Sequence, residues 1–172
     1  MTTTTAPQFS LEGFSGTVFR PDDAGYDEAR EVFNGMIDRR PALIARCAGV
    51  DDVVAVVNLA RDNDLPLSIY GGGHGVTGSA VVDAGICLDL RGMRAVDVDP
   101  DARRARVEGG ATWGEVDAAT QEHGLAVTGA GCRVPGWQAW PWEAGAVGSS
   151  VPSASSATTW WRPRWSPPTA GW

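Results

Sequence analysis

A cluster of glycines around one histidine is the feature that most constrains how this chain can fold. Residues 70–78 read YGGGHGVTG, and three of the glycines directly follow an apolar segment. Because glycine has no Cβ atom, its backbone reaches positive φ angles and its amide can approach a ligand closely. Successive amides in such a turn form a nest that binds phosphate or pyrophosphate. The segment therefore predicts an anion-binding loop.

Other readings of these glycines remain open at this point. A dinucleotide fingerprint is a G-x-G-x-x-G that opens a helix, whereas strands are expected after the glycines here, and no Gly-Lys-Ser/Thr of a P-loop follows them. Glycine-rich segments also serve simply as turns, in which case His74 is an ordinary surface histidine. The second histidine, His123, falls at a predicted helix end, where a positive charge is favourable. Two histidines so far apart predict no metal site.

The segments before the glycines alternate between strand and helix. Residues 42–47 form a short apolar run, which predicts a strand. Residues 53–60 carry apolar side chains at i, i+3, i+4 and i+7, which predicts a helix, with Asp51 as its N-cap. Residues 65–70 predict the next strand. The unit is therefore βαβ, with its strands parallel.

The order of elements changes after the glycines. Further short strands are expected over residues 85–90, 95–99, 104–108 and 125–128. Turn-forming residues separate the first three, which indicates a small antiparallel meander. Helices are expected over residues 26–36 and 113–123, and Gly124 ends the second as a C′ glycine. The predicted fold class is therefore α+β.

The composition excludes several classes of protein. Hydrophobic residues make up 43% of the 172 residues and the net charge is −7. A buried core is expected, and nucleic acid and anionic membrane surfaces are poor partners. No stretch approaches the roughly 18 apolar residues of a membrane span, and the first residues lack a signal-peptide pattern. Three scattered cysteines predict a cytoplasmic protein without disulfides.

Two longer stretches resemble a known family. They are PALIARCAGVDDVVAVVNLARDNDLPLSIYGGGHGVTG and GICLDLRGMRAVDVDPDARRARVEGGATWGEVDAATQEHGLAVTG. Together, from about Arg40 to Gly129, they resemble the N-terminal half of the FAD-binding domain of berberine-bridge-enzyme-like FAD-linked oxidases. These enzymes belong to the vanillyl-alcohol-oxidase / para-cresol-methylhydroxylase (PCMH) superfamily. The resemblance implies an incomplete PCMH-type FAD-binding domain.

The resemblance also implies roles for the loop. In the family, a Gly-Gly-Gly-His loop wraps the FAD pyrophosphate and its histidine bonds covalently to the flavin 8α-methyl group, a role that falls on His74. The expected cofactor-binding residues are Gly71, Gly72, Gly73, His74, Gly75, Thr77 and Gly78. Two positions depart from the family pattern: Tyr70 stands where an arginine is common, and Gly75 where a serine is common. The flavin would carry the redox chemistry while the protein positions it.

Residues 130–172 are a different kind of sequence. They hold seven of the eight tryptophans and most of the prolines, without helical or strand periodicity. Tryptophan has the single codon TGG, so a one-base shift turns Trp137-Gln138 into alanine and Trp142-Glu143 into glycine. The remaining junctions allow a second glycine-rich loop. We therefore hypothesise that this tail is translated out of frame. The alternative is a genuine Trp/Pro-rich segment that binds a partner.

These inferences predict three parts: an N-terminal extension over residues 1–39, a partial FAD-binding domain over residues 40–129, and an irregular tail over residues 130–172. The expected function is that of an FAD-dependent oxidoreductase, or a fragment of one, with FAD held covalently through His74. Its substrate is expected to be a small molecule that the sequence does not identify, and no catalytic base is assigned. The alternative is a truncated, non-catalytic product with weak or no flavin binding.

Overall fold

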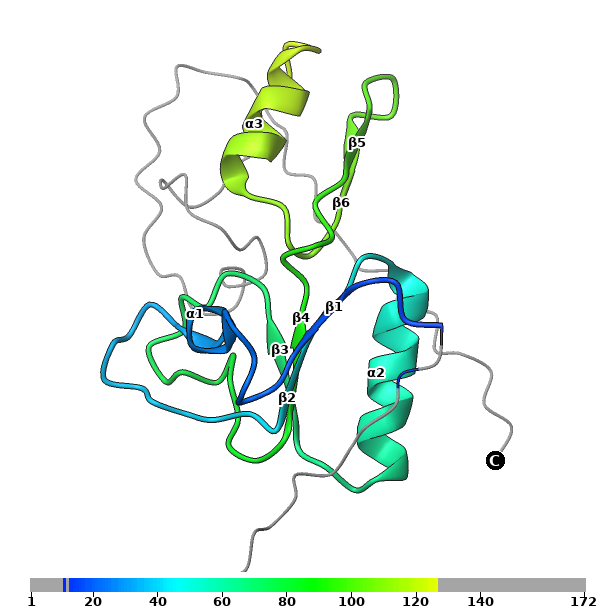
Figure 1. Ribbon diagram of the computed structural model, residues 1–172. Helices are drawn as coiled ribbons and strands as arrows, with labels where there is room; N and C mark the ends of the chain where they lie inside the picture. The colour runs from blue at the N-terminus through cyan, green and yellow to red at the C-terminus, as the bar shows by residue number, and fades with distance from the viewer. Residues whose placement is uncertain (1–10, 12, 127–172) are drawn as a thin grey trace, which may run out of the picture.

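A four-stranded sheet lies at the centre of the protein. The computed structural model describes residues 11 and 13–126, and Figure 1 shows how they are arranged. The order of the strands in the sheet is β1 (Thr17–Phe19), β2 (Leu43–Arg46), β4 (Ile86–Asp89) and β3 (Leu67–Tyr70). Strands β2, β4 and β3 are parallel, and β1 is antiparallel to β2.

The predicted βαβ unit is confirmed, with one addition. Strand β2, helix α2 (Val50–Asp62) and strand β3 follow one another along the chain, and the two strands run in the same direction. However, β4 lies between them in the sheet. All four residues of β4 are buried, as expected of a central parallel strand that is covered on both faces.

The predicted meander is therefore wrong in one respect. Residues 85–90 were expected to pair antiparallel with the strands that follow, but this segment joins the parallel sheet as β4. Only β5 (Val96–Asp99) and β6 (Arg104–Val107) form an antiparallel pair. The physical reason is that Ile86, Cys87 and Leu88 are apolar on both faces, whereas β5 and β6 alternate between exposed and half-buried residues. The α+β fold class is confirmed.

Two helices cover opposite faces of the sheet, α2 on one and α1 (Tyr26–Arg30) on the other, as Figure 1 shows. Because side chains alternate between the faces of a strand, β2 and β4 supply residues to both cores. The core beneath α2 contains Leu43, Ala45, Val56, Ala60, Ile86 and Leu88, among others. The core beneath α1 contains Tyr26, Ala29, Ile44, Tyr70, Val81 and Cys87.

Helix α1 is much shorter than predicted. It ends at Arg30, and Glu31 takes the extended ψ of 135°. The hydroxyl of Tyr70 donates to the Glu31 carbonyl at 2.5 Å, and the amide of Phe33 donates to the Gly73 carbonyl at 3.0 Å. These contacts with residues far along the chain replace the helical hydrogen bonds expected over residues 31–36.

The other two helices agree better with the sequence. Helix α2 contains the whole predicted segment 53–60 and ends at Asp62, and its N-cap is Gly49 and not Asp51. Helix α3 (Trp113–Gln121) begins with a capping box between Thr112 and Glu115, a pattern that fixes a helix start. None of the helices within residues 11 and 13–126 is long and apolar enough to cross a membrane.

Gly124 has the positive φ of 65° expected at C′. The strand predicted over residues 125–128 is absent at residues 125 and 126. Residues 127 and 128 lie outside the described part of the chain, as does the tail over residues 130–172, so the frame hypothesis stays a prediction.

Asp52 links the N-terminal segment to helix α2. Its carboxylate is buried and accepts the Ser15 amide at 2.9 Å and the Ala48 amide at 2.8 Å. Burial alone would raise the pKa of this carboxyl group, but the hydrogen bonds from Ser15 and Ala48 outweigh burial, and the pKa is lowered. The charged form is therefore the one that the fold stabilises.

This arrangement predicts acid sensitivity. A carboxyl group whose pKa is lower in the folded than in the unfolded state stabilises the fold above the unfolded pKa of about 3.9, and this contribution is lost as the pH falls through the folded value. The free energy of unfolding should fall below about pH 5, and Asp52→Asn should reduce that slope by up to about one proton. Urea unfolding at stepped pH values measures it. Identical slopes for the wild type and the variant would contradict the prediction.

Candidate functional site

The glycine loop, residues 71–78, lies where a ligand is expected in a sheet of this kind. It directly follows the carboxyl end of β3, which pairs in parallel with the central strand β4. In open parallel sheets, ligands bind beyond the carboxyl ends of the strands. The sequence-predicted residues Gly71, Gly72, Gly73, His74, Gly75, Thr77 and Gly78 are thus together in one loop at this edge.

Two of the glycines are required by the backbone itself. Gly73 has φ +67°, and a Cβ atom there would lie 2.5 Å from the hydroxyl oxygen of Tyr70. Gly78 has φ +65°, and a Cβ atom there would lie 2.6 Å from the Ile37 side chain. Such φ angles disfavour any residue with a side chain. Gly75 differs, because a Cβ atom would meet only Ser79 Oγ at 3.7 Å, so the serine common in the family would fit.

The polar groups of the loop are divided in a way that favours an anion. Its carbonyls accept protein donors: Phe33 N to Gly73 at 3.0 Å, Asn34 Nδ2 to Val76 at 2.8 Å, and Arg39 Nη1 to Gly78 at 3.1 Å. By contrast, no acceptor among the described residues pairs with the amides of Gly71, Gly72, Gly73, Gly75 and Thr77. The loop therefore keeps these amide donors available while the carbonyls of Gly73, Val76 and Gly78 are occupied, which is the polarity of an anion-binding nest.

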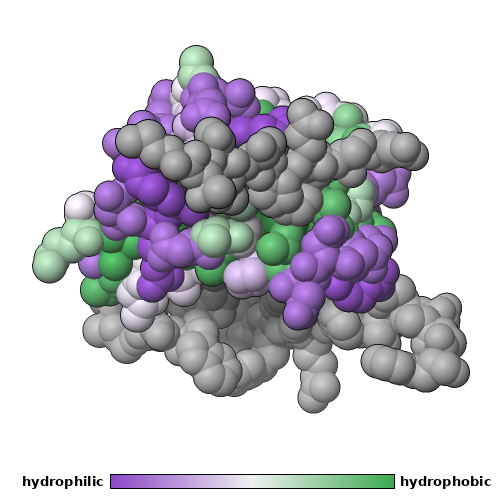
Figure 2. Space-filling model, turned by 60° about the horizontal axis from the view of Figure 1, so that its bottom comes forward, coloured by the Kyte–Doolittle hydropathy of each residue, from purple (hydrophilic) through white to green (hydrophobic). Residues whose placement is uncertain are grey.

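His74 is half-buried within this loop. Its ring centroid lies 5.9 Å from that of Phe33, with the planes tilted by 57°, a separation and tilt within the range of favourable aromatic pairs. Phe33 is 75% exposed, and the nearby Val76 is 74% exposed. Figure 2 shows one face of the molecule, on which apolar residues reach the surface between strongly hydrophilic areas. His74 therefore has an apolar neighbour that is itself open to a ligand.

The segment over residues 31–39 supports the loop, and sequence reasoning missed it. Besides Phe33, it contributes Asn34, whose side chain bonds the Val76 carbonyl. Arg39 bonds the carbonyls of Gly78 and Val81 at 3.1 and 3.0 Å. These partners are about 40 residues apart in the chain, and nothing in the local pattern of residues 31–39 indicates the pairing.

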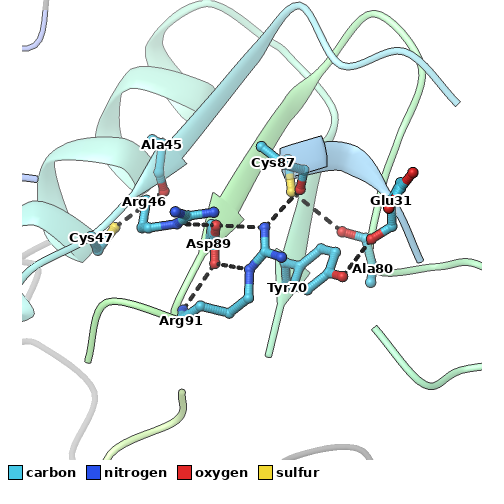
Figure 3. A network of polar contacts seen from close by, with 10 residues as sticks. Glu31, Ala45, Arg46, Cys47, Tyr70, Ala80, Cys87, Asp89 and Arg91 are labelled. Atoms are coloured by element: carbon cyan, nitrogen blue, oxygen red, sulfur yellow. Dashed lines mark hydrogen bonds and ion pairs between the residues drawn. The ribbon is translucent and has the colours of Figure 1, made fainter. Parts of the chain in front are cut away.

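A buried charge lies next to the loop. Asp89, at the end of β4, is 0% exposed, and its carboxylate accepts Arg46 Nε at 2.8 Å and Arg91 Nη2 at 2.9 Å. Arg91 also donates to the Ala29 carbonyl at 2.7 Å, and its guanidinium carbon lies 4.0 Å from the centroid of the Tyr70 ring. Figure 3 shows this chain of contacts from Arg46 to Tyr70. A charged residue within the apolar run ICLDL was the signal that could have revealed it.

The two described cysteines are not reactive groups of this site. Cys47 and Cys87 are both free and buried. Burial raises the pKa of each thiol to about 12, so both remain protonated at neutral pH. Because the thiolate is the nucleophilic form, neither side chain is suited to covalent chemistry in this state.

The fold and the loop define one class of protein. The family described as "FAD binding domain" matches residues 41–137, more than half of the chain. The chain belongs to this family, and several of its relatives are named FAD-linked oxidoreductases. The resemblance identified from the sequence is thereby confirmed, and the match continues past Gly129 to residue 137.

Individual relatives agree with the family assignment. The chain is 43% identical over 115 residues to (R)-6-hydroxynicotine oxidase of Paenarthrobacter nicotinovorans, covering 66% of this chain and 25% of that protein. It is 32% identical over 117 residues to berberine bridge enzyme-like 14 of Arabidopsis thaliana, covering 64% and 22%. The crystal structure of 6-hydroxy-D-nicotine oxidase from Arthrobacter nicotinovorans superposes with a TM-score of 0.63 at 37% identity, covering 73% and 26%. The chain thus spans about a quarter of the length of these relatives.

Asp89 should be essential for stability. Removing one partner of a buried ion pair leaves the other charges without compensation, which typically costs about 3–5 kcal/mol. We expect Asp89→Asn to lower the free energy of unfolding by an amount in or slightly below this range, because Arg46 and Arg91 are partly exposed. Asp62→Asn, which breaks the exposed pair with Arg61, should cost less than about 1 kcal/mol. Equal losses in urea unfolding would contradict the prediction.

The two loop glycines Gly73 and Gly75 should respond differently to alanine. Gly73→Ala forces a side chain into left-handed backbone and against Tyr70, so it should cost at least about 1–2 kcal/mol. Gly75→Ala meets only an ordinary contact and should change the free energy of unfolding by less than about 0.5 kcal/mol. Thermal and urea unfolding of the two variants test this. If both alanines are tolerated equally, the loop does not have the backbone described here.

Proposed function

We propose that residues 71–78 bind the pyrophosphate of FAD through their backbone amides, and that His74 holds the flavin covalently. The observation that carries the proposal is the division of polar groups in the loop. The amides of Gly71, Gly72, Gly73 and Gly75 have no acceptor among the described residues, while the carbonyls of Gly73, Val76 and Gly78 are bonded. Membership of the FAD-binding domain family supports FAD as the anionic ligand.

The loop backbone suits this ligand because its glycines have no side chain that would keep the amides away from the pyrophosphate. At Gly73, the α-carbon faces Tyr70 with no space for a Cβ atom, so the chain is held in a tight curve. Arg39 fixes the far end of the loop by bonding the Gly78 carbonyl. A loop braced at both ends presents its amides without reorganisation when the ligand binds, which lowers the entropic cost of binding.

His74 is the nucleophile that the loop offers. The imidazole is half-buried, and the exposed Phe33 ring beside it can pack against an aromatic ligand. For attachment, an imidazole nitrogen replaces a hydrogen of the flavin 8α-methyl group: N–H and C–H bonds break and a C–N bond forms. The two electrons and two protons released by this bond formation would be taken up by oxygen or another oxidant. When bound, FAD supplies the hydride or electron acceptor for substrate oxidation.

The whole protein is proposed to oxidise a small organic molecule. The support is the similarity to (R)-6-hydroxynicotine oxidase, whose name gives a small-molecule substrate for that relative. The substrate of this protein is a separate question, because the chain spans about a quarter of that relative. No observation on the described residues favours the alternative of a chain without flavin binding. We also propose a reducing compartment, consistent with the two free, buried thiols.

A comparison of the two histidines tests the attachment. The purified 172-residue chain is incubated with FAD and oxygen, denatured in acid, and examined for flavin fluorescence on a denaturing gel and for the added mass of one FAD. We expect the wild type to retain flavin and His74→Ala to lose all of it. The control is His123→Ala, which removes the only other histidine, an exposed one, and should retain flavin like the wild type.

Each outcome distinguishes one part of the proposal. Wild-type protein that binds flavin but releases it on denaturation would reject the covalent link and leave the amide nest. Wild-type protein that binds no flavin would reject both. Flavin retained by His74→Ala would show that another residue forms the bond.

A further inference from the structure

Tyr70 lies between the buried charges and the glycine loop. It is the last residue of β3 and is 5% exposed. The guanidinium of Arg91 lies over one face of its ring, 4.0 Å from the centroid, a distance suited to a cation–π contact. Arg91 is in turn fixed by Asp89 and by the Ala29 carbonyl, as Figure 3 shows for Asp89. Arg91 and its partners therefore fix the position of the Tyr70 ring.

The hydroxyl of Tyr70 reaches the loop by two routes. It lies directly against Gly73, where a Cβ atom would be 2.5 Å from its oxygen. It also donates to the Glu31 carbonyl at 2.5 Å. Two residues further along, the Phe33 amide donates to the Gly73 carbonyl, and the Phe33 ring lies 5.9 Å from the ring of His74. One hydroxyl thus lies against Gly73, the residue before His74, and bonds the segment that carries the Phe33 ring.

From this geometry we infer that Tyr70 is a positioning residue for His74. Its hydroxyl, by holding residues 31–33 against the loop, orients the imidazole toward the reactive methyl group of the flavin. The inference rests on the proposed covalent attachment to His74 and adds a residue that acts through Phe33 without touching the reacting atoms. A phenylalanine at position 70 would keep the packing on Arg91 and lose only the hydrogen bond to Glu31.

The effect should be on attachment more than on stability. The Tyr70–Glu31 hydrogen bond is part-buried, and losing one such bond typically removes only a modest part of the stability of a fold, so the variant should still fold. Reaction geometry is more demanding, since a misplacement of about 1 Å can slow a reaction by about a hundredfold. Removing the hydroxyl should therefore slow covalent attachment while leaving the affinity for FAD nearly unchanged.

The chain contains one matched control, because it has two tyrosines. Tyr26 is also buried, and its hydroxyl also donates to a backbone carbonyl, that of Pro41 at 2.6 Å. Pro41 lies outside the glycine loop. Tyr26→Phe therefore removes the same kind of hydrogen bond from the same core without touching the segment that faces His74.

The experiment follows covalent attachment at saturating FAD in Tyr70→Phe, Tyr26→Phe and the wild type. We expect Tyr70→Phe to slow attachment about tenfold or more, and Tyr26→Phe to leave the rate within about twofold. The dissociation constant for FAD, measured in a His74→Ala background where no bond forms, should change less than threefold in both. If Tyr70→Phe fails to fold, Phe33→Leu takes its place, because that side chain is largely exposed, and the same slowing is expected.

An unchanged rate in the folded Tyr70→Phe variant, or in Phe33→Leu where it is used, would overturn the inference. So would equal slowing by Tyr26→Phe, which would make the effect one of general stability. If the wild type itself forms no covalent flavin, the proposed attachment fails and the inference falls with it. If the wild type attaches flavin and Tyr70→Phe does so at the same rate, the inference about Tyr70 fails and the proposed attachment to His74 stands.

Discussion

The buried carboxylate of Asp89 is the interaction on which the rest of this structure depends. A charge removed from water is tolerated only with well-placed partners, and Asp89 has two arginines, Arg46 and Arg91. Its partner in register on β2 is Arg46 and on β3 is Tyr70. The contacts therefore align the carboxyl ends of three parallel strands, and through the Ala29 carbonyl they also fix helix α1.

The position of the glycine loop depends on these contacts of Asp89. It begins where β3 ends, directly after Tyr70, and its carbonyls are bonded by residues 33–39, which run beside it. A loop placed on a rigid edge in this way can keep its amides available for a ligand. This chain has Tyr70 at the position where an arginine is common in the family. A different arginine, Arg91, follows the end of the neighbouring strand β4 and places its guanidinium over the Tyr70 ring.

Much of the fold followed from local patterns, and the exceptions share a cause. The helix over α2, the strands before and after it, and the C′ role of Gly124 were predicted because periodicity and turn chemistry act within a few residues. The insertion of β4 between β2 and β3 was not predicted. Nor was the early end of α1, where hydrogen bonds to Tyr70 and Gly73 override a helical pattern.

The sequence by itself determined the chemistry of the loop: which residues lack side chains, which one is a histidine, that a strand precedes them, and to which family the pattern belongs. Only the tertiary structure decided which polar groups of that loop remain available and what surrounds His74. The physical reason is distance along the chain. Glycine's backbone freedom is a property of the residue, whereas the partners that occupy the carbonyls and hold Tyr70 come from segments 39 to 62 residues away.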